Sequence, residues 1–220
     1  MSHCVVTGAN RGIGLELAKQ LHQQGHQVTV LCRQPSAELN ALGVNIVSGI
    51  DVSQDSCIEA ITQALAQQPV DLLINNAGIL RDESLEQPNW ATIREQFEVN
   101  TLGPLRVTHA LLPNLVKGAK VALITSRMGS IADNTSGGRY GYRLSKAALN
   151  AVGKSMAMDL RTRDIAVSLL HPGYVATGMT GNHGDITPDV AASRLLQRID
   201  EMSLGNSGSF FHSNGDLLPW

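Results

Sequence analysis

The stretch TGANRGIG, residues 7–14, lies where an apolar run gives way to a helical pattern. The run CVVTG (4–8) that enters it predicts a β-strand. Apolar residues at helical spacing follow it as far as Gly25 and predict a helix. The three glycines of the stretch permit a tight turn, because glycine adopts backbone conformations that are closed to other residues. The stretch therefore predicts a strand–turn–helix unit.

Strand and helix patterns alternate along the rest of the chain. Apolar or β-branched runs that predict strands lie at 27–32, 44–50, 70–76, 120–126, 165–173 and 207–213. Helical patterns lie at 57–68, 89–116, 139–163 and 187–202, and Pro104 and Pro113 make the second of them one or two helices. Strands that are apolar throughout indicate a parallel sheet covered by helices on both faces. We predict one doubly wound α/β domain over residues 1–220, with a mostly parallel sheet of about seven strands.

Composition and charge argue against several classes of protein. The 220 residues carry a formal net charge of −2 and no long basic run, so nucleic acid and anionic membranes are poor partners. No stretch reaches the roughly 18 apolar residues of a membrane span. The N-terminal residues enter a strand and the glycine turn at once, without room for a signal peptide, so we expect a cytoplasmic protein. Cys4, Cys32 and Cys57 lack metal-ligand spacing, so we expect buried reduced thiols and no metal.

The glycine turn has the composition of a phosphate-binding loop. Gly8, Gly12 and Gly14 have the spacing G-x-x-x-G-x-G and stand between the first strand and the first helix. Such a turn lets the backbone approach a pyrophosphate at a helix N-terminus. A plain tight turn remains the alternative, but the position in an α/β chain favours dinucleotide binding.

The end of the second strand predicts which dinucleotide is bound. An acidic residue there hydrogen-bonds the ribose 2′-hydroxyl of NAD, whereas a basic residue accommodates the 2′-phosphate of NADP. The strand ends with Cys32 and Arg33, no carboxylate follows until Glu38, and Arg11 in the glycine turn is a second cation. Each arginine alone could be a surface residue, but the two together favour NADP(H).

A set of motifs in a fixed order gives the chain a family resemblance. TGANRGIG is followed by NNAG (75–78), VNTLGP (99–104), ITSRMGS (124–130), YRLSK (142–146) and HPGYVATGM (171–179). In this order the motifs resemble the short-chain dehydrogenase/reductase superfamily over nearly the whole chain. The stretch from residue 126 to 150 and the ending GDLLPW are similar to the branch of C-factor and Sniffer-type carbonyl reductases. The resemblance implies a Rossmann fold that binds NADP(H).

One tyrosine and one lysine have the spacing of an acid–base pair. Tyr142 stands four residues before Lys146, one helical turn away on the same face, whereas Tyr140 points elsewhere. A free phenol titrates near pH 10, and a neighbouring cation favours the phenolate. The resemblance implies that Tyr142 is the general acid of carbonyl reduction and that Lys146 also holds the nicotinamide ribose.

Two further residues complete the catalytic set that the resemblance implies. Ser126 matches the serine that hydrogen-bonds the substrate carbonyl oxygen. Thr125 is its rival, and only one of the two can face the site because successive strand side chains point to opposite faces. Asn100 matches an asparagine that binds a water in a proton relay ending at the lysine.

The resemblance also implies the cofactor contacts. Asp51 matches an adenine-binding carboxylate, and Pro172, Gly173 and Thr177 match the contact to the nicotinamide carboxamide. The full predicted set is Gly8, Asn10, Arg11, Gly12, Ile13, Gly14, Arg33, Asp51, Val52, Asn76, Ala77, Gly78, Tyr142, Lys146, Pro172, Gly173, Val175 and Thr177.

Two functions remain open at this point. The first is NADPH-dependent reduction of a small-molecule carbonyl (an aldehyde, ketone or quinone) to an alcohol. The second is a signalling or nucleotide-sensing role like that of C-factor, in which catalysis is secondary. Residues 174–186 are too short for a large lid and predict a shallow pocket with broad substrate selection. The resemblance further implies a homodimer formed through the helix that follows Tyr142.

Overall fold

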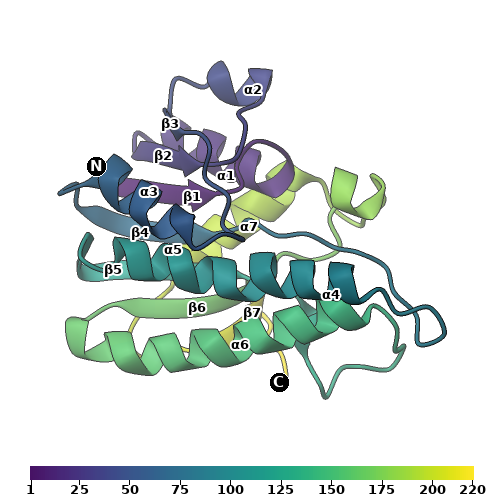
Figure 1. The fold of residues 1–220 in the computed structure, drawn as a ribbon. Coiled ribbons are helices and arrows are strands. Elements are labelled where there is room, and N and C mark those ends of the chain that lie inside the picture. Colours follow the sequence, from purple (N-terminus) through teal and green to yellow (C-terminus); the bar gives the residue numbers. More distant parts are fainter.

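Seven strands form one parallel sheet in the computed structural model, which describes residues 1–220 (Figure 1). The strands are β1 (His3–Thr7), β2 (Gln27–Leu31), β3 (Asn45–Val47), β4 (Val70–Asn75), β5 (Leu115–Ile124), β6 (Ala166–His171) and β7 (Ser209–His212). Their order across the sheet is β3-β2-β1-β4-β5-β6-β7, and every neighbouring pair is parallel. The predicted doubly wound α/β fold is confirmed.

Helices cover both faces of the sheet. They are α1 (Gly12–Gln23), α2 (Ala37–Asn40), α3 (Ser56–Leu65), α4 (Trp90–Phe97), α5 (Gly103–Leu111), α6 (Tyr140–Leu160) and α7 (Pro188–Asp200). α1 and α7 pack on one face, and α3, α5 and α6 pack on the other, in front of the sheet in Figure 1. Along β1, Cys4 and Val6 face the α1–α7 layer while Val5 faces the opposite layer. A strand that is buried on both sides must be apolar throughout, so uninterrupted apolar runs in the sequence predict such strands.

The predicted helical region 89–116 differs in detail from the structure. It divides into α4, a π-helical segment (Glu98–Leu102) and α5, and it ends at Leu111 because β5 already begins at Leu115. Pro104 does not break a helix, because it lies in the first turn of α5, where no intrahelical N–H donor is required. β5 reaches back to Leu115 to pair with Val70, across a register shift between Val70 and Leu72.

Two other elements also differ from the prediction. α2 was not predicted, since four residues show no periodicity; its start is capped by Ser36 Oγ, which accepts from Leu39 N at 3.1 Å. β3 is shorter than the predicted 44–50, and Gly49 turns the chain away with a φ of +79°.

β7 completes the sheet as the sequence suggested, and the chain then folds back over it. Phe211 and Leu217 form an isolated antiparallel bridge. The ring of Trp220 stacks on Phe210 at a centroid distance of 5.6 Å, and the carbonyl oxygen of Trp220 accepts from Ala132 N at 2.9 Å. The last residues therefore lie against the loop that follows β5.

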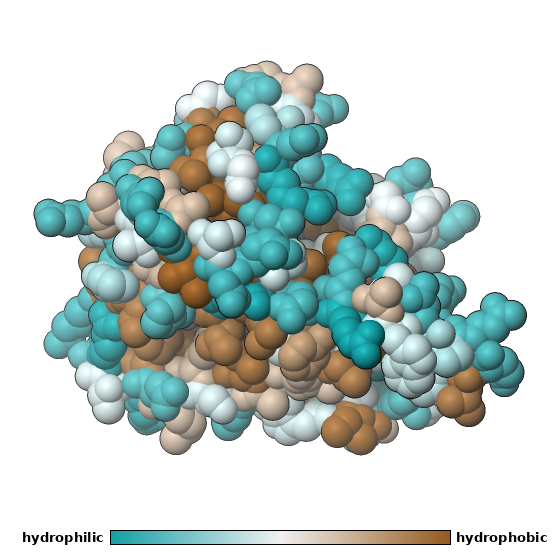
Figure 2. Space-filling model, viewed as in Figure 1, coloured by the Kyte–Doolittle hydropathy of each residue, from teal (hydrophilic) through white to brown (hydrophobic).

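The surface over α5 and α6 carries exposed apolar side chains, among them Leu105, Leu144 and Met158. Figure 2 shows apolar residues gathered over these helices, below a more polar region. None of the helices has both the length and the apolar character that crossing a membrane would require.

Candidate active site

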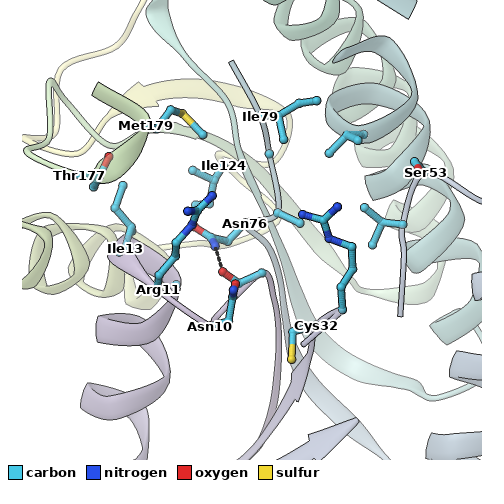
Figure 3. A pocket seen from close by; sticks show the side chains of 18 of the residues that line it. Asn10, Arg11, Ile13, Cys32, Ser53, Asn76, Ile79, Ile124, Thr177 and Met179 are labelled. Atoms are coloured by element: carbon cyan, nitrogen blue, oxygen red, sulfur yellow. Dashed lines mark hydrogen bonds between the residues drawn. The ribbon is translucent and has the colours of Figure 1, made fainter. Parts of the chain in front are cut away.

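A cavity of about 360 Å³ lies at the carboxyl ends of the strands (Figure 3). It is centred where β1 and β4 are neighbours and the connections turn to opposite faces of the sheet. Ligands of α/β proteins bind in the crevice that such a point leaves. All the predicted cofactor contacts line this cavity except Gly173 and Val175.

The glycine turn places main-chain atoms at the cavity wall. Gly8 and Gly12 have φ angles of +66° and +57°, which side-chain-bearing residues rarely adopt. A Cβ at Gly14 would lie 2.6 Å from Gly8 O and would overlap Asn76 Nδ2, so no side chain fits. α1 begins at Gly12, and its first N–H groups have no acceptor within the helix. These donors suit a phosphate.

The end of β4 is locked to the glycine turn. Thr7 Oγ1 accepts from Asn76 N and from Ala77 N, both at 3.0 Å. Asn76 Nδ2 donates to Thr7 O at 3.0 Å and to Gly8 O at 3.2 Å, and its side chain reaches toward the turn in Figure 3. A Cβ at Gly8 would lie 2.8 Å from Ala77 Cα. The ends of β1 and β4 therefore pack main chain against main chain and form one wall of the cavity.

Two arginines give one part of the cavity a positive charge. Arg11 and Arg33 are exposed residues that line it, and neither forms an ion pair. Arg11 extends into the cavity in Figure 3, and Cys32, at the end of β2, is buried. Asp51 is turned toward its own loop, where Oδ1 accepts from Ser53 N at 3.0 Å and from Ser53 Oγ at 2.8 Å.

The rim includes an ion pair that the sequence did not reveal. Arg81 Nη2 lies 3.1 Å from Glu95 Oε1, and both residues line the cavity. Arg81 stands three residues after the NNAG motif, which is a weak signal. Glu95 lies within α4, and no pattern in the sequence marks that position.

The opposite wall holds the tyrosine and the lysine. Tyr142 and Lys146 are one turn apart on α6, only 8% and 4% exposed, and both line the cavity. Lys146 Nζ lies 5.9 Å from the centre of the Tyr142 ring and donates to Ile124 O at 2.9 Å. Tyr140 is 43% exposed and does not line the cavity.

Burial dominates the electrostatics of this pair. It raises the pKa of Tyr142, although a hydrogen bond with Ser126 and the charge of Arg139 act in the opposite direction. Burial also lowers the pKa of Lys146 to about 8. Lys146 is not among the causes of the shift at Tyr142, so its predicted effect on the phenolate stays a prediction. The ammonium group is directed at a main-chain carbonyl, and burial disfavours the charged phenolate.

Ser126 and Thr125 differ in the partners of their hydroxyl groups. The buried Thr125 hydroxyl donates to Asn150 Oδ1 at 2.7 Å and is thereby committed to α6. Thr125 lines the cavity, but its hydroxyl is used in this bond. Ser126 Oγ accepts from Met128 N at 3.1 Å, and Ser126 is also one of the groups that act to lower the pKa of Tyr142. The Thr125 hydroxyl thus has a partner on α6, and the choice of Ser126 as the active hydroxyl stays a prediction.

Asn100 lies in the π-helical segment behind the lysine. Its Oδ1 accepts from Ile79 N at 2.8 Å, and its Nδ2 donates to Ile79 O at 2.8 Å and to Ser145 Oγ at 3.0 Å. The side chain is completely buried and joins the loop after β4 to α6. Neither Asn100 nor Ser126 lines the cavity itself.

The segment that follows β6 forms one side of the cavity opening. Pro172 and Thr177 line it, and Thr177 Cγ2 would lie 3.5 Å from a Cβ at Gly12. Gly173 has a φ of +98°, and the buried Val175 pairs with Ile186 instead of lining the cavity. The segment contains only a single 3₁₀ turn, Gly178–Thr180, and no long helix.

The histidines form no metal site. His171 is buried, its ring meets that of His212 edge-on at 4.9 Å, and its pKa is lowered to about 3, chiefly by burial. His22 and His26 stand four residues apart, yet no group of three or more histidine, cysteine, aspartate or glutamate side chains gathers to hold a metal ion. His171 is a packed, neutral residue.

Comparison with known proteins agrees with this geometry. The family model for short chain dehydrogenases matches residues 2–186. The 1-hydroxy-2-glutathionyl-2-methyl-3-butene dehydrogenase of Rhodococcus sp. (strain AD45) is 42% identical over 226 residues, which cover both chains completely. The C-signal protein of Myxococcus xanthus is 46% identical over 155 residues, which are 69% of this chain and 93% of that protein.

Two solved structures resemble the whole fold. The NADPH-bound carbonyl reductase from chicken fatty liver superposes with a TM-score of 0.91 at 31% identity, covering 100% of this chain and 99% of that one. The carbonyl reductase Sniffer of D. melanogaster has the same TM-score and identity, with both chains covered completely.

Proposed function

The chain belongs to the short-chain dehydrogenase family, and we propose that it reduces a small carbonyl compound to an alcohol with NADPH. The observation that supports this most directly is the arrangement of one cavity. Tyr142 and Lys146 line one wall of it, with Ser126 near the tyrosine hydroxyl, while the glycine turn and two arginines line another part. Hydride donor and proton donor would meet between these walls.

The residues present fit an NADP(H) molecule. The closely packed Gly14 and the free N–H groups at the start of α1 suit a pyrophosphate. Arg11 and Arg33 offer two cations without carboxylate partners, and β2 ends without an acidic residue, as a 2′-phosphate requires. The chicken carbonyl reductase, which is similar over its whole length, carries NADPH.

The chain's own residues would perform the acid–base part of the reaction. NADPH, when bound, supplies the hydride. Ser126 and Tyr142 would donate hydrogen bonds to the carbonyl oxygen, where negative charge develops. Tyr142 would then give up its proton. Its raised pKa keeps the phenol protonated at neutral pH, as an acid in the reduction direction must be.

Lys146 and Asn100 would support proton delivery. With a pKa of about 8, Lys146 is still mostly protonated at neutral pH and places a positive charge one turn from Tyr142. The side-chain amide of Asn100 is committed to Ile79 and Ser145. A water in the proton relay would therefore be held by main-chain atoms of the π-helical segment.

The test is the oxidation of NADPH by the purified protein with a panel of aldehydes, ketones and quinones. The Tyr142→Phe variant is the control, because it keeps the ring and removes only the hydroxyl. Turnover that Tyr142→Phe abolishes supports the proposal. Equal NADPH oxidation by both proteins across the panel would contradict it.

The direction of the reaction is tested with the same protein. The Rhodococcus relative is named as the dehydrogenase of a glutathionylated alcohol, so the panel should include hydroxyalkyl thioethers of glutathione with NADP⁺. The opening formed by residues 172–186 has no helical lid, which is compatible with a bulky group beside the reacting carbon.

A signalling role is the second candidate, because the chain is 46% identical to C-signal over 69% of its length. In a protein that acts only as a signal, Tyr142→Phe would abolish turnover and leave the biological phenotype intact. Loss of both in that variant would favour the enzyme.

The exposed apolar face of α5 and α6, with Leu105, Leu144 and Met158, suits a second copy of the chain (Figure 2). A homodimer in sedimentation analysis that Leu144→Glu converts to a monomer would support this. A wild-type monomer at assay concentrations would contradict it.

A further inference from the structure

The helix that carries Tyr142 and Lys146 begins without a cap of its own. Its N-cap residue, Arg139, has a left-handed conformation with a φ of +50° and makes no side-chain cap hydrogen bond. The first turn contains no acidic residue. Tyr142 is the third residue of α6, so it lies within the turn that frays when the first N–H groups lack acceptors.

A buried carboxylate from another part of the chain occupies this position. Glu83, in the loop after β4, is only 5% exposed. Its Oε2 accepts from Gly141 N, in the first turn of α6, at 3.2 Å. Its main-chain oxygen accepts from Arg139 N at 2.9 Å. An anion at this point also interacts favourably with the positive end of the helix dipole.

The other carboxylate oxygen ties Glu83 to α4. Oε1 accepts from Gln96 Nε2 at 2.6 Å and from Thr92 Oγ1 at 2.8 Å. The Gln96 amide is held in this orientation, because its own oxygen accepts from Arg81 N at 2.9 Å. Every polar partner of the Glu83 side chain is thus a donor, and a carboxylate satisfies all three at once.

The approach of α4 to α6 leaves no room for a side chain at residue 141. A Cβ at Gly141 would overlap Gln96 Nε2 and would lie 2.9 Å from Ile93 Cα and 3.1 Å from Glu83 Oε1. Gly141 is the residue directly before Tyr142. Because Glu83 contacts Gly141, a shift of Glu83 would move the main chain next to Tyr142.

We propose that Glu83 is a positioning residue that caps α6 from the loop after β4 and thereby fixes the hydroxyl of Tyr142 beside Ser126. The inference rests on the proposed function, in which Tyr142 is the proton donor. The same loop begins at the cavity wall formed by Asn76, Ala77 and Gly78. One short segment would thus hold both the dinucleotide side and the proton-donor side of the site.

Glu83→Gln separates the two halves of this contact. An amide oxygen can still accept from Gln96 and Thr92, but the amide NH₂ would then face Gly141 N, donor against donor. Thr92→Val is the matched control, since it removes a hydrogen bond on the α4 side and leaves the cap on α6 intact. Glu86→Gln, on an exposed residue of the same loop, controls for the loss of charge.

Three measurements are made on the full-length variants: kcat with saturating NADPH, the Kd of NADPH, and hydrogen exchange of the amides of residues 141–143. For Glu83→Gln we expect kcat to fall by about fivefold or more, the factor that corresponds to the typical free energy lost with a helix cap. NADPH Kd should stay within about twofold, and exchange of the first turn should accelerate. Thr92→Val and Glu86→Gln should keep kcat within about twofold and leave that exchange unchanged.

Three outcomes would overturn the proposal: kcat of Glu83→Gln within about twofold of wild type, an equal loss in Thr92→Val, or unchanged exchange in the first turn. If Glu83→Gln does not fold, Glu83→Asp decides. It keeps the charge and loses about one bond length of reach, so an unchanged kcat and unchanged exchange would reject the cap. Hydrogen exchange needs no turnover, so a wild-type protein that is inactive on every carbonyl would refute the proposed function while the exchange data still test the cap.

Discussion

Replacing Arg33 by glutamine removes one of the two guanidinium groups in the cavity with little cost to the fold. The main-chain oxygen of Arg33 accepts from Gly49 N at 3.0 Å, which a glutamine backbone preserves. Its side chain is exposed and forms no ion pair. The free energy of unfolding should therefore change by less than about 0.5 kcal/mol.

The effect on the cofactor follows from simple electrostatics. Two unit charges about 4 Å apart attract by roughly 1 kcal/mol in water and roughly 4 kcal/mol at an effective dielectric constant of 20. Arg33 is exposed, so its attraction for the 2′-phosphate should lie near the lower value. We therefore expect its removal to cost about 1–2 kcal/mol of interaction with NADPH. That loss is about a 5- to 30-fold decrease in kcat/KM for NADPH. NADH lacks the 2′-phosphate, so its kcat/KM should be unchanged.

Steady-state rates with NADPH and NADH, at low and high salt, check this expectation. Raising the ionic strength from about 0.01 M to 1 M shortens the screening length from roughly 30 Å to 3 Å, so the preference of the wild type should shrink. Arg161→Gln, which changes an exposed arginine outside the cavity, is the matched control. An equal loss for both cofactors, or none for NADPH, would refute the assignment of Arg33 to the phosphate.

Three further predictions concern the cavity wall and the lysine. Gly14→Ala places a methyl group 2.6 Å from Gly8 O. NADPH binding should therefore be lost, and the free energy of unfolding should fall by about 1–3 kcal/mol. NADPH titration and thermal unfolding check these two effects, and unchanged NADPH binding would contradict the close packing at Gly14. Ser126→Ala should lower kcat by about 100-fold with little change in stability. Thr125→Val should retain most of kcat, but it leaves Asn150 Oδ1 unpaired and should lower the free energy of unfolding by about 1–3 kcal/mol. Rates and urea unfolding of both variants check this pair, and a reversed pattern would make Thr125 the active hydroxyl. Burial lowers the pKa of Lys146 to about 8, so its positive charge is present below that pH and lost above it. We therefore expect kcat to decline as pH rises through about 8. A kcat that stays level up to about pH 10 would exclude the ammonium group from catalysis.

Most of the fold could be predicted from the sequence because its strands are buried on both faces. Val5 and Val6 face opposite helix layers, so the chain carries apolar residues without alternation and the run is easily recognised. The boundaries that were wrong depend on tertiary pairing. Leu115 is a strand residue because it meets Val70, and no local pattern distinguishes it from the end of a helix.

The candidate site was predictable only where local spacing carries the chemistry. The glycine turn and the Tyr142–Lys146 pair are of this kind, and both line the cavity. The partner of the Thr125 hydroxyl is Asn150, which is 25 residues away, and no local pattern predicts that bond. The raised pKa of Tyr142 likewise depends on burial, which the local sequence does not show. Glu83 could not be singled out, because its partners lie on two different helices.

The turn-back of the chain after β7 has a consequence for the behaviour of the protein in concentrated solution. β7 is the last strand of the sheet, and a strand in that place presents unpaired main-chain groups on which another molecule can extend the sheet. Here His212 N donates to Asp216 O at 2.8 Å and Leu218 N donates to Phe210 O at 2.8 Å, so the outer border is already occupied by the chain itself. At the opposite border β3 has only three residues, too few to template a long pairing. Both borders of the parallel sheet thus offer few main-chain groups to an added strand, and residues 216–218 provide this cover at β7.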